Sequence, residues 1–248
     1  MHSTGWLMKG VSGHPGRFLK VKRTGMSDTD QSLVDEQVRY YRQRASEYDD
    51  WFFRRNRYDR GPDHTLRWRN EIQLLRNLLG GLAPSGRILE LACGSGLWTE
   101  QLARHATSLT AIDTSPEMLA LNRARVGSNT VRYQQGDIFR WEPAELYDFI
   151  FFGFWLSHVP PSRFAAFWQK LRSSLAPGGR VYFVDNYSEV DRCQVAERRS
   201  LSDGRSFTIV KVSYELEALA SRLRSLGWDC TCSQTPSFFF CGTAMVST

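Results

Sequence analysis

The sequence predicts an α/β fold in which a mainly parallel sheet is covered by helices on both faces. Three observations support this class. Apolar, strand-sized segments alternate with helical segments between residues 86 and 185, which is typical of parallel sheets. The segment Asp148–Phe154 is almost continuously apolar, as a central strand of such a sheet would be. A glycine turn, Gly94-Ser95-Gly96, follows the first strand and precedes a helix.

The first 26 residues differ from the rest of the 248-residue chain. They carry five basic residues and no acid, and they lack the apolar stretch of a secretory signal. We expect residues 1–27 to form a disordered tail; translation from Met26, or a targeting role for the tail, are the alternatives. The remaining chain has a formal charge of only +1. The overall charge of +6 is therefore weak evidence for a nucleic-acid partner.

Residues 28–82 are predicted to form an N-terminal helical cap. A first helix is indicated from residue 28 by apolar residues at helical spacing, namely Val34, Val38, Tyr41, Ala45 and Tyr48. A second helix should begin at Pro62, since proline suits the first helical turn. Its apolar stripe consists of Trp68, Ile72, Leu75 and Leu79. Gly80-Gly81 should end it.

From residue 86 the pattern predicts the sheet, with its helices, strand by strand. The expected strands are 87–93, 108–113, 131–137, 148–154 and 180–185. The expected helices are 97–104, a helix starting at Ser115-Pro116, 160–175 and 214–226. Two further strands, Trp228–Gln234 and Phe238–Ala244, are joined by a short turn and should form an antiparallel hairpin at one edge of the sheet.

Two further features bound the interpretation. In the insert 186–212, Phe207–Val210 has strand character and is expected to add a wall to a pocket. The five cysteines form no C-x-x-C pair, so reduced thiols in a cytoplasmic protein are expected and a metal site is not. No stretch reaches the roughly 18 consecutive apolar residues that a membrane-spanning helix needs.

The residues that carry chemistry follow the strands. In an open α/β sheet, ligands bind beyond the carboxyl ends of the strands, which places Gly94, Asp113 and Asp137 around one crevice. Asp113 ends the second strand, where a carboxylate can accept hydrogen bonds from both ribose hydroxyls. A dinucleotide site would need a third glycine where Thr99 stands. Glu90 would also oppose a pyrophosphate, whereas it suits a cationic ligand, so a nicotinamide-dependent dehydrogenase is disfavoured.

Three segments together resemble the class I S-adenosylmethionine (SAM)-dependent methyltransferases of the small-molecule type with an N-terminal helical lid. They are E-L-A-C-G-S-G at 90–96, A-I-D-T-S at 111–115 and Q-G-D-I-F at 135–139. The similarity extends over residues 86–245. It implies a Rossmann-like seven-stranded sheet of order 3-2-1-4-5-7-6 within a methyltransferase domain at 83–248, and SAM as the cofactor.

The resemblance also implies roles for individual residues. The cofactor-binding set would be Glu90, Ala92, Gly94, Gly96, Asp113, Thr114, Asp137, Ile138 and Phe154, with Tyr40 and Arg44 from the lid segment V-R-Y-Y-R-Q-R-A-S-E-Y-D. Glu90 would face the amino-acid end of SAM, Asp113 the ribose, and Asp137 with Ile138 the adenine. Tyr41 could equally pack in the core. Trp155 and Asp185 are the expected substrate-binding residues.

His158 is the candidate catalytic residue, because its unperturbed pKa of ~6.5 suits a general base. The alternative is that it only closes the site. A base is needed only if the acceptor must lose a proton.

The sequence therefore predicts methyl transfer to a small-molecule acceptor, at oxygen, nitrogen or carbon, such as a secondary metabolite. An acidic or an aromatic acceptor would suit the Arg-rich, aromatic segment 51–60. An RNA methyltransferase is one alternative, but base-amine methylation uses a [DN]-P-P-[YF] turn where this chain reads G-F-W-L. A catalytically silent cofactor-binding module is the other. The sequence does not indicate an oligomeric state.

Overall fold

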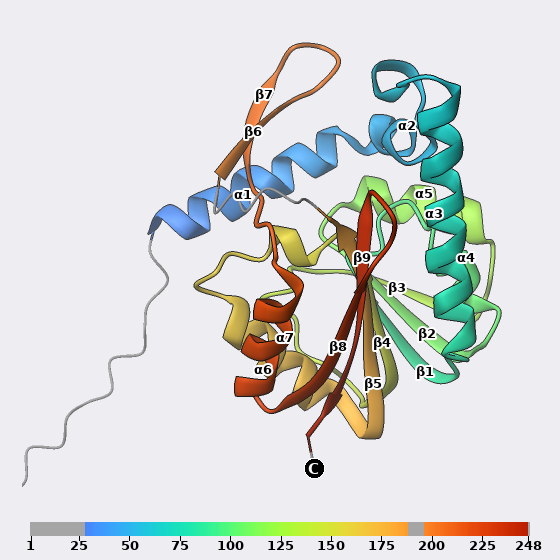
Figure 1. Cartoon of the computed structure of the whole chain (residues 1–248), viewed down its shortest axis with the longest axis vertical. Coiled ribbons are helices and arrows are strands. Elements are labelled where there is room, and N and C mark those ends of the chain that lie inside the picture. Colours follow the sequence, from blue (N-terminus) through green and yellow to red (C-terminus); the bar gives the residue numbers. More distant parts are fainter. Residues whose placement is uncertain (1–27, 188–195, 248) are drawn as a thin grey trace, which may run out of the picture.

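A computed structural model describes residues 28–187 and 196–247 (Figure 1). The main sheet has seven strands in the order β3-β2-β1-β4-β5-β9-β8. They are β1 (Gly86–Leu91), β2 (Ala106–Asp113), β3 (Val131–Gln135), β4 (Tyr147–Gly153), β5 (Leu175–Asn186), β8 (Trp228–Gln234) and β9 (Phe239–Val246). Strands β1 to β5 pair in parallel, and β9 is antiparallel to both β5 and β8. The predicted order is confirmed, with β8 and β9 as the sixth and seventh strands of the sheet. The tail predicted to be disordered, 1–27, lies outside the described residues.

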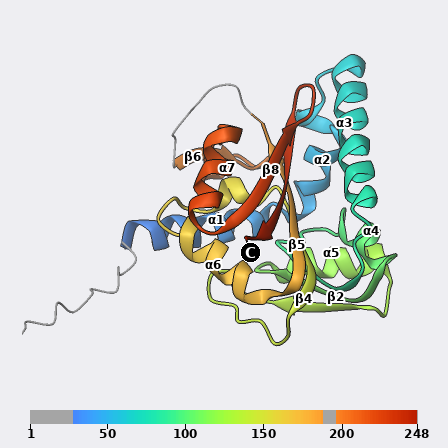
Figure 2. The same ribbon diagram turned by 60° about the horizontal axis from the view of Figure 1, so that its bottom comes forward.

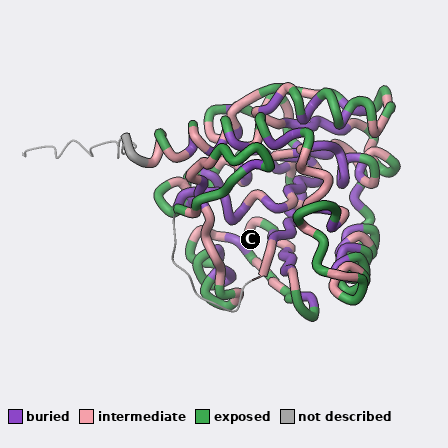
Figure 3. Tube along the Cα trace, turned by 90° about the horizontal axis from the view of Figure 1, so that it is seen from above, coloured by how far each residue is buried: buried purple, intermediate pink, exposed green. Residues whose placement is uncertain are grey.

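Helices cover both faces of this sheet (Figures 1 and 2). One face carries α3 (Pro62–Gly81), α4 (Thr99–Ala103) and α5 (Pro116–Val126), and the other carries α6 (Phe164–Ser174) and α7 (Leu216–Ser225). Successive strand residues alternate between the two cores. In β4, Phe149 and Phe151 pack on the α3 side, and Ile150 and Phe152 on the α6 side. Figure 3 shows the resulting buried interior.

The N-terminal helices α1 (Asp28–Gln43) and α2 (Tyr48–Phe53) lie across one end of the sheet (Figure 1). The predicted first helix is confirmed, but its buried face differs from the predicted stripe. Within α1 the buried positions are Val34, Gln37 and Tyr40, whereas Val38 and Tyr41 are only half-buried. The predicted stripe continues beyond the end of α1 at Gln43, where Arg44 and the predicted Ala45 are both buried. Two polar side chains therefore face the interior.

Helix α3 ends as predicted and buries its predicted stripe of Trp68, Ile72, Leu75 and Leu79. These side chains belong to the same hydrophobic core as side chains of the main sheet, so α3 packs directly on the sheet. The division of the chain at residues 82/83 stays a prediction. Among the helices that the structure describes, none has the length and apolar character needed to cross a membrane.

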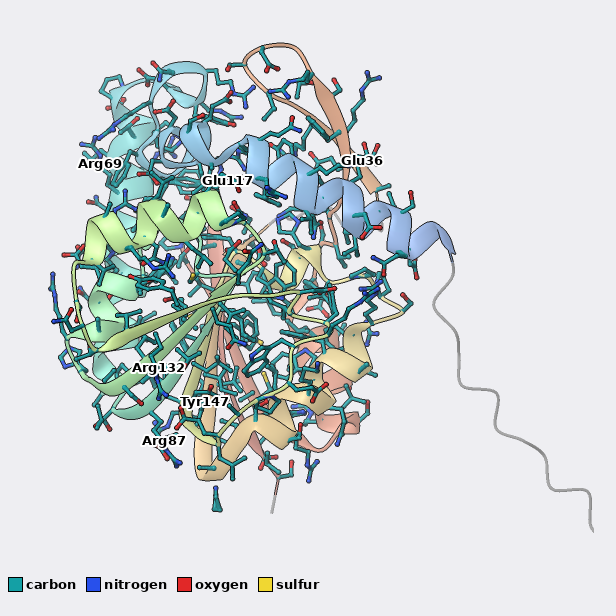
Figure 4. The ribbon with its side chains drawn as sticks, turned by 180° about the vertical axis from the view of Figure 1, so that it is seen from behind. Glu36, Arg69, Arg87, Glu117, Arg132 and Tyr147 are labelled. Atoms are coloured by element: carbon teal, nitrogen blue, oxygen red, sulfur yellow. The ribbon has the colours of Figure 1, made fainter. Side chains whose placement is uncertain are left out.

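A second, two-stranded sheet is formed by β6 (Ala196–Ser200) and β7 (Ser206–Val210), an antiparallel hairpin. It lies against α1 (Figure 1), where Leu201 and Ile209 pack around Tyr40. The backbone N–H of Thr208 donates to Glu36 Oε1 at 2.6 Å, and Figure 4 labels Glu36 on α1. The strand predicted within Phe207–Val210 is thus confirmed.

Candidate functional site

A cavity with two adjoining lobes lies between the carboxyl ends of the strands and the N-terminal helices. The first, here called the sheet lobe, encloses about 510 Å³ and is lined by Tyr41, Tyr48, Ala92, Gly94, Asp113, Thr114, Met118, Ile138, Gly153, Phe154, Trp155 and His158. The second, the hairpin lobe, encloses about 430 Å³ and is lined by Tyr40, Tyr41, Arg44, Tyr48, Trp51, Phe154, His158, Asn186, Arg199, Ile209 and Lys211. The two lobes share four residues, so ligands in them would meet.

Asp113 is fixed at the end of β2 by two backbone donors. Its Oδ2 accepts the N–H of Gly94 at 2.9 Å, and its Oδ1 accepts the N–H of Ser115 at 2.9 Å. Gly94 has φ +51°, a conformation that glycine adopts without strain. Burial raises the pKa of Asp113, although the backbone hydrogen bonds oppose this. Each carboxylate oxygen keeps a lone pair for a ligand hydroxyl.

Glu90 is a buried carboxyl group within β1. Thr99 hydrogen-bonds it, but its Oε2 has no hydrogen-bond partner among the described residues. Burial raises the pKa of Glu90 to about 8. A buried carboxylate with an unused oxygen is costly, and a cationic ligand beside it would reduce that cost. Glu90 lies behind the sheet lobe and is not one of its lining residues.

The other residues predicted to bind cofactor or substrate divide into those at the sheet lobe and those away from it. Ala92, Thr114, Ile138 and Phe154 line it, and so does Trp155, which was predicted to contact substrate. Gly96 does not line it: a Cβ there would meet Asn122 Oδ1 at 2.7 Å, so this glycine permits close packing of α5.

Asp137 lies in a neighbouring groove beside Thr114 and α1. Its Oδ1 accepts the N–H of Phe139 at 2.9 Å, and its Oδ2 lies 3.6 Å from Arg140 Nε.

Tyr40 and Arg44, predicted to contact the cofactor, line the hairpin lobe and not the sheet lobe. Tyr40 is a buried residue of α1 that packs against Leu201 and Ile209 of the hairpin segment, and Arg44 is buried in the turn just after α1. Arg44 as a residue is 7% exposed, and its guanidinium carbon lies within 6.0 Å of the ring centroids of Tyr40, Tyr41, Tyr48, Trp51 and Tyr58. Its one hydrogen bond goes to Tyr58 Oη at 3.3 Å. In the described ranges it has no carboxylate partner.

Two further cations reach the hairpin lobe from the hairpin segment. Lys211 Nζ donates to Ser157 Oγ at 2.8 Å and lies 3.8 Å from Asp185 Oδ1, and burial lowers its pKa. On β6, Arg199 Nη2 lies 3.0 Å from Glu197 Oε1. Among the described residues, 28–187 and 196–247, the lobe is therefore lined by three cationic side chains and no carboxylate.

Asp185, predicted to bind substrate, is fully buried and lines neither lobe. Its carboxylate accepts the N–H of Ser157 at 2.8 Å and the hydroxyl of Ser157 at 2.9 Å. It therefore holds the turn after β4 and the lysine beside it, and it reaches the cavity only through them.

His158 lies where the two lobes meet, at the end of the short helix η3 (Leu156–His158). Its Nδ1 is 2.7 Å from the carbonyl oxygen of Val210, and its Nε2 is 2.8 Å from the hydroxyl of Tyr41. Burial and the nearby Lys211 hold the pKa of His158 well below its usual range. The prediction that it is a general base stays a prediction.

The N-terminal helices are tied to the sheet side of the cavity by ionic contacts. Arg42 on α1 lies 3.0 Å from Glu117 at the start of α5, and Figure 4 shows Glu117 at the α5 end nearest α1. From α2, Asp49 accepts hydrogen bonds from Ser95 Oγ at 2.6 Å and from Arg125. Cofactor would have to enter beneath these contacts.

Several residues of the cavity were not predicted from the sequence. They include Tyr48, Met118, Asn186, Arg199 and Lys211. Gln37 lines neither lobe but hydrogen-bonds to the backbone of His158, and it was not predicted either. Gln37 and Tyr48 lie in the segment expected to form the first helix, and the sequence does not show which side of that segment faces the cavity. Arg199 and Lys211 flank the strand expected at Phe207–Val210, and that strand was the one available signal for them.

Comparison with known proteins agrees with this geometry. Residues 88–179 match a family model described as a methyltransferase domain. The DhpI–SAH complex is 40% identical with a TM-score of 0.75, over 88% of this chain and 98% of DhpI. A DhpI–SAM–HEP complex is 39% identical with a TM-score of 0.73, over 86% and 97%.

Among curated proteins, Nodulation protein S of Rhizobium tropici is 32% identical over 47% of this chain and 49% of its own length. The ubiquinone biosynthesis O-methyltransferase of Xanthomonas axonopodis pv. citri (strain 306) is 32% identical over 49% and 52%. The chain thus spans about half the length of these curated relatives.

The sheet order, the terminal antiparallel pair and the cavity at the strand ends define a class I methyltransferase fold. The chain belongs to the class I SAM-dependent methyltransferases, and its cofactor is SAM.

Proposed function

We propose that this methyltransferase transfers the methyl group of SAM to a small anionic acceptor, with the acceptor in the hairpin lobe. One observation carries the proposal: the buried residue Arg44 lines a lobe to which the described part of the chain contributes two more cations and no carboxylate. Burying an unpaired charge is expensive, and an anionic ligand would compensate it through charge-assisted hydrogen bonds. A neutral aromatic acceptor would leave that charge unpaired.

In this proposal SAM occupies the sheet lobe. Asp113 accepts the ribose hydroxyls, and Thr114 and Ile138 border the nucleoside. Asp137 reaches the adenine from the adjacent groove. Glu90 lies behind the backbone of Ala92 and Gly94, and its unused oxygen favours the cationic amino-acid end. SAM supplies the methyl group, and Gly96 acts indirectly by letting α5 pack.

The protein contributes alignment more than chemistry. A sulfonium is already a good leaving group, so fixing the acceptor in line with the methyl group is the main task, and such positioning is worth up to ~7–11 kcal/mol in favourable cases. Phe154 and Tyr48 line both lobes and therefore lie where the lobes adjoin. Trp155 lines the sheet lobe only. An acceptor oxygen that arrives as an anion has no proton to lose, so no base is required.

The relatives support a small-molecule acceptor. DhpI has been solved with SAM and HEP together, and the Xanthomonas relative is named as an O-methyltransferase of ubiquinone biosynthesis. Oxygen is therefore the first acceptor atom to test, and HEP is the first candidate compound.

The test has two stages with the full-length protein. Calorimetry should detect SAM and SAH binding and no NADH binding; absence of SAM binding contradicts the assignment of the site. SAH formation is then followed with HEP, with small carboxylates and phosphate esters, and with their neutral methyl-ester or alcohol analogues. Turnover of anions and not of their neutral partners is expected. Turnover only of neutral acceptors, or of RNA, overturns the proposal.

A further inference from the structure

The partners of His158 determine which ring nitrogen carries the proton. A carbonyl oxygen can only accept, so the 2.7 Å contact with Val210 requires a hydrogen on Nδ1. In the neutral ring Nε2 then has a lone pair, and it accepts the hydroxyl hydrogen of Tyr41 at 2.8 Å. Both nitrogens are thereby used within the protein.

Gln37 joins the same residues through the backbone. Its side chain is buried at 2% exposure. Its Nε2 donates to the carbonyl oxygen of His158 at 3.3 Å, and its Oε1 accepts the N–H of Val210 at 3.1 Å. The N–H of Val212 also donates to the carbonyl oxygen of Ser157 at 2.8 Å. Helix α1, the turn after β4 and the hairpin are thus held in one register around the imidazole.

The charged groups around His158 oppose its protonation. Lys211 and Arg199 approach from the hairpin side, and Arg44 approaches from the turn just after α1. The neighbouring carboxylate, Asp185, is occupied by Ser157 and Lys211. Tyr41 stacks edge-on at a centroid distance of 5.3 Å. A proton on Nε2 would add a fourth positive charge and reverse the hydrogen bond to Tyr41.

We propose that His158 is a positioning residue, held as the neutral Nδ1–H tautomer by Val210 and Gln37, which fixes the Tyr41 hydroxyl and takes no proton during methyl transfer. With its hydrogen committed to His158, the Tyr41 oxygen faces the junction of the two lobes as a hydrogen-bond acceptor only. The part that concerns turnover rests on the proposed function; the tautomer itself does not.

The first experiment needs no acceptor. The full chain is labelled with [15N]histidine, and long-range 1H–15N spectra are recorded between pH 8 and pH 5.5, with His158→Asn to assign the resonance. We expect a protonated Nδ1 and an unprotonated Nε2 for His158 throughout, whereas the same sample in denaturant titrates. An Nε2–H tautomer, or conversion to imidazolium in this range, overturns the proposal whatever the acceptor proves to be.

Variants of Gln37 test the clamp by the same spectrum. Gln37→Ala should shift the Nδ1–H resonance of His158 or mix its tautomers, while SAH affinity is retained because Gln37 lines neither lobe. Gln73→Ala, an exposed glutamine of α3, is the matched control and should leave the His158 signals unchanged. An unaltered His158 spectrum in Gln37→Ala removes Gln37 from the proposal.

The second experiment distinguishes positioning from base catalysis with whichever anion the acceptor assays show to be methylated. His158→Gln keeps an oxygen that accepts from Tyr41, and we expect it to keep activity within about tenfold, with a rate independent of pH between 6 and 9. His158→Ala should fall further. A general base contributes ~10²–10⁴-fold, so a His158→Gln loss in that range, with SAH binding intact, overturns the proposal. If no anion is turned over, the proposed function fails and the spectra alone decide the tautomer.

Discussion

The two lobes of the cavity are built in different ways. The sheet lobe is formed mainly by turns that directly follow β1, β2 and β4, and its fixed charge is the carboxylate of Asp113. The hairpin lobe is formed by α1 and a hairpin, and it is cationic. Gln37 and Val210, which join those two elements, are 173 residues apart in the chain. The cofactor half therefore depends on local strand-turn geometry, whereas the acceptor half depends on how distant segments dock.

The largest expected effect is the loss of cofactor affinity when Asp113 of the sheet lobe is replaced. Asp113→Ala removes the acceptor for two ribose hydroxyls and frees the N–H of Gly94. We expect SAH affinity by calorimetry to fall about 100-fold, or about 3 kcal/mol. Asp148→Ala is the control, because Asp148 pairs with Arg87 at the opposite ends of the strands (Arg87 is labelled in Figure 4). Unchanged SAH affinity in Asp113→Ala would sink the assignment of the sheet lobe.

The next effect should be confined to the hairpin lobe. Arg44→Gln removes the buried guanidinium, and truncating a desolvated charge partner costs ~2 kcal/mol or more. The KM of an anionic acceptor should rise about 30-fold, with SAH affinity unchanged because Arg44 does not line the sheet lobe. Arg69→Gln, on the exposed side of α3, should alter neither quantity. Equal losses of acceptor and SAH binding would show that the lobes are not separate.

Glu90 should give the binding of SAM at the sheet lobe a pH dependence. With a pKa raised to about 8, Glu90 is protonated at neutral pH, and cationic SAM should displace up to about one proton on binding. Calorimetry in buffers of different ionisation enthalpy measures this release, which Glu90→Gln should abolish. Equal proton release by the wild-type protein and by Glu90→Gln would contradict the assignment of the displaced proton to Glu90.

The same group affects the stability of the unliganded protein. Because the folded state holds this proton above the ordinary pKa of 4.5, the free energy of unfolding should fall as pH rises from about 4.5 to about 8. Denaturant titrations should show that Glu90→Gln reduces this slope.

The smallest effects concern the contacts that join the N-terminal helices α1 and α2 to α5 and to the turn after β1. Arg42→Gln breaks an exposed ion pair with Glu117, and such pairs contribute ~0.2–1 kcal/mol. SAH should dissociate up to about fivefold faster in stopped-flow measurements, with the difference lost at high salt. Arg125→Gln, which breaks the half-buried network with Asp49 and Ser95, should have the larger effect of the two. The reverse ranking would contradict the network as the main closure.

Sequence and structure agree best where function is local. The alternating apolar segments predicted the parallel strands and the terminal pair predicted the antiparallel hairpin, whereas the strand order was implied by the resemblance to class I methyltransferases. Gly94 and Asp113 were expected at the crevice because they follow strands, and Ile138 was expected there through the resemblance; all three line the sheet lobe. Tyr40 and Arg44 were predicted as cofactor contacts, and the structure places them at the hairpin lobe, Tyr40 on α1 and Arg44 just after it. This position could not be predicted, since a polar buried face cannot be recognised from an apolar stripe. Arg199 and Lys211 belong to no motif, and only the docking of the hairpin on α1 brings them to the cavity.

The contact from position 210 to His158 uses a backbone carbonyl, and every amino acid supplies one. Substitutions in the hairpin could therefore change the size and charge of the acceptor lobe while the imidazole keeps its orientation. Related enzymes could therefore hold this histidine in the same way and methylate different acceptors, although their hairpin sequences have no residue in common. The hairpin is accordingly the segment to exchange when a new acceptor is sought, provided that its register on α1 is kept.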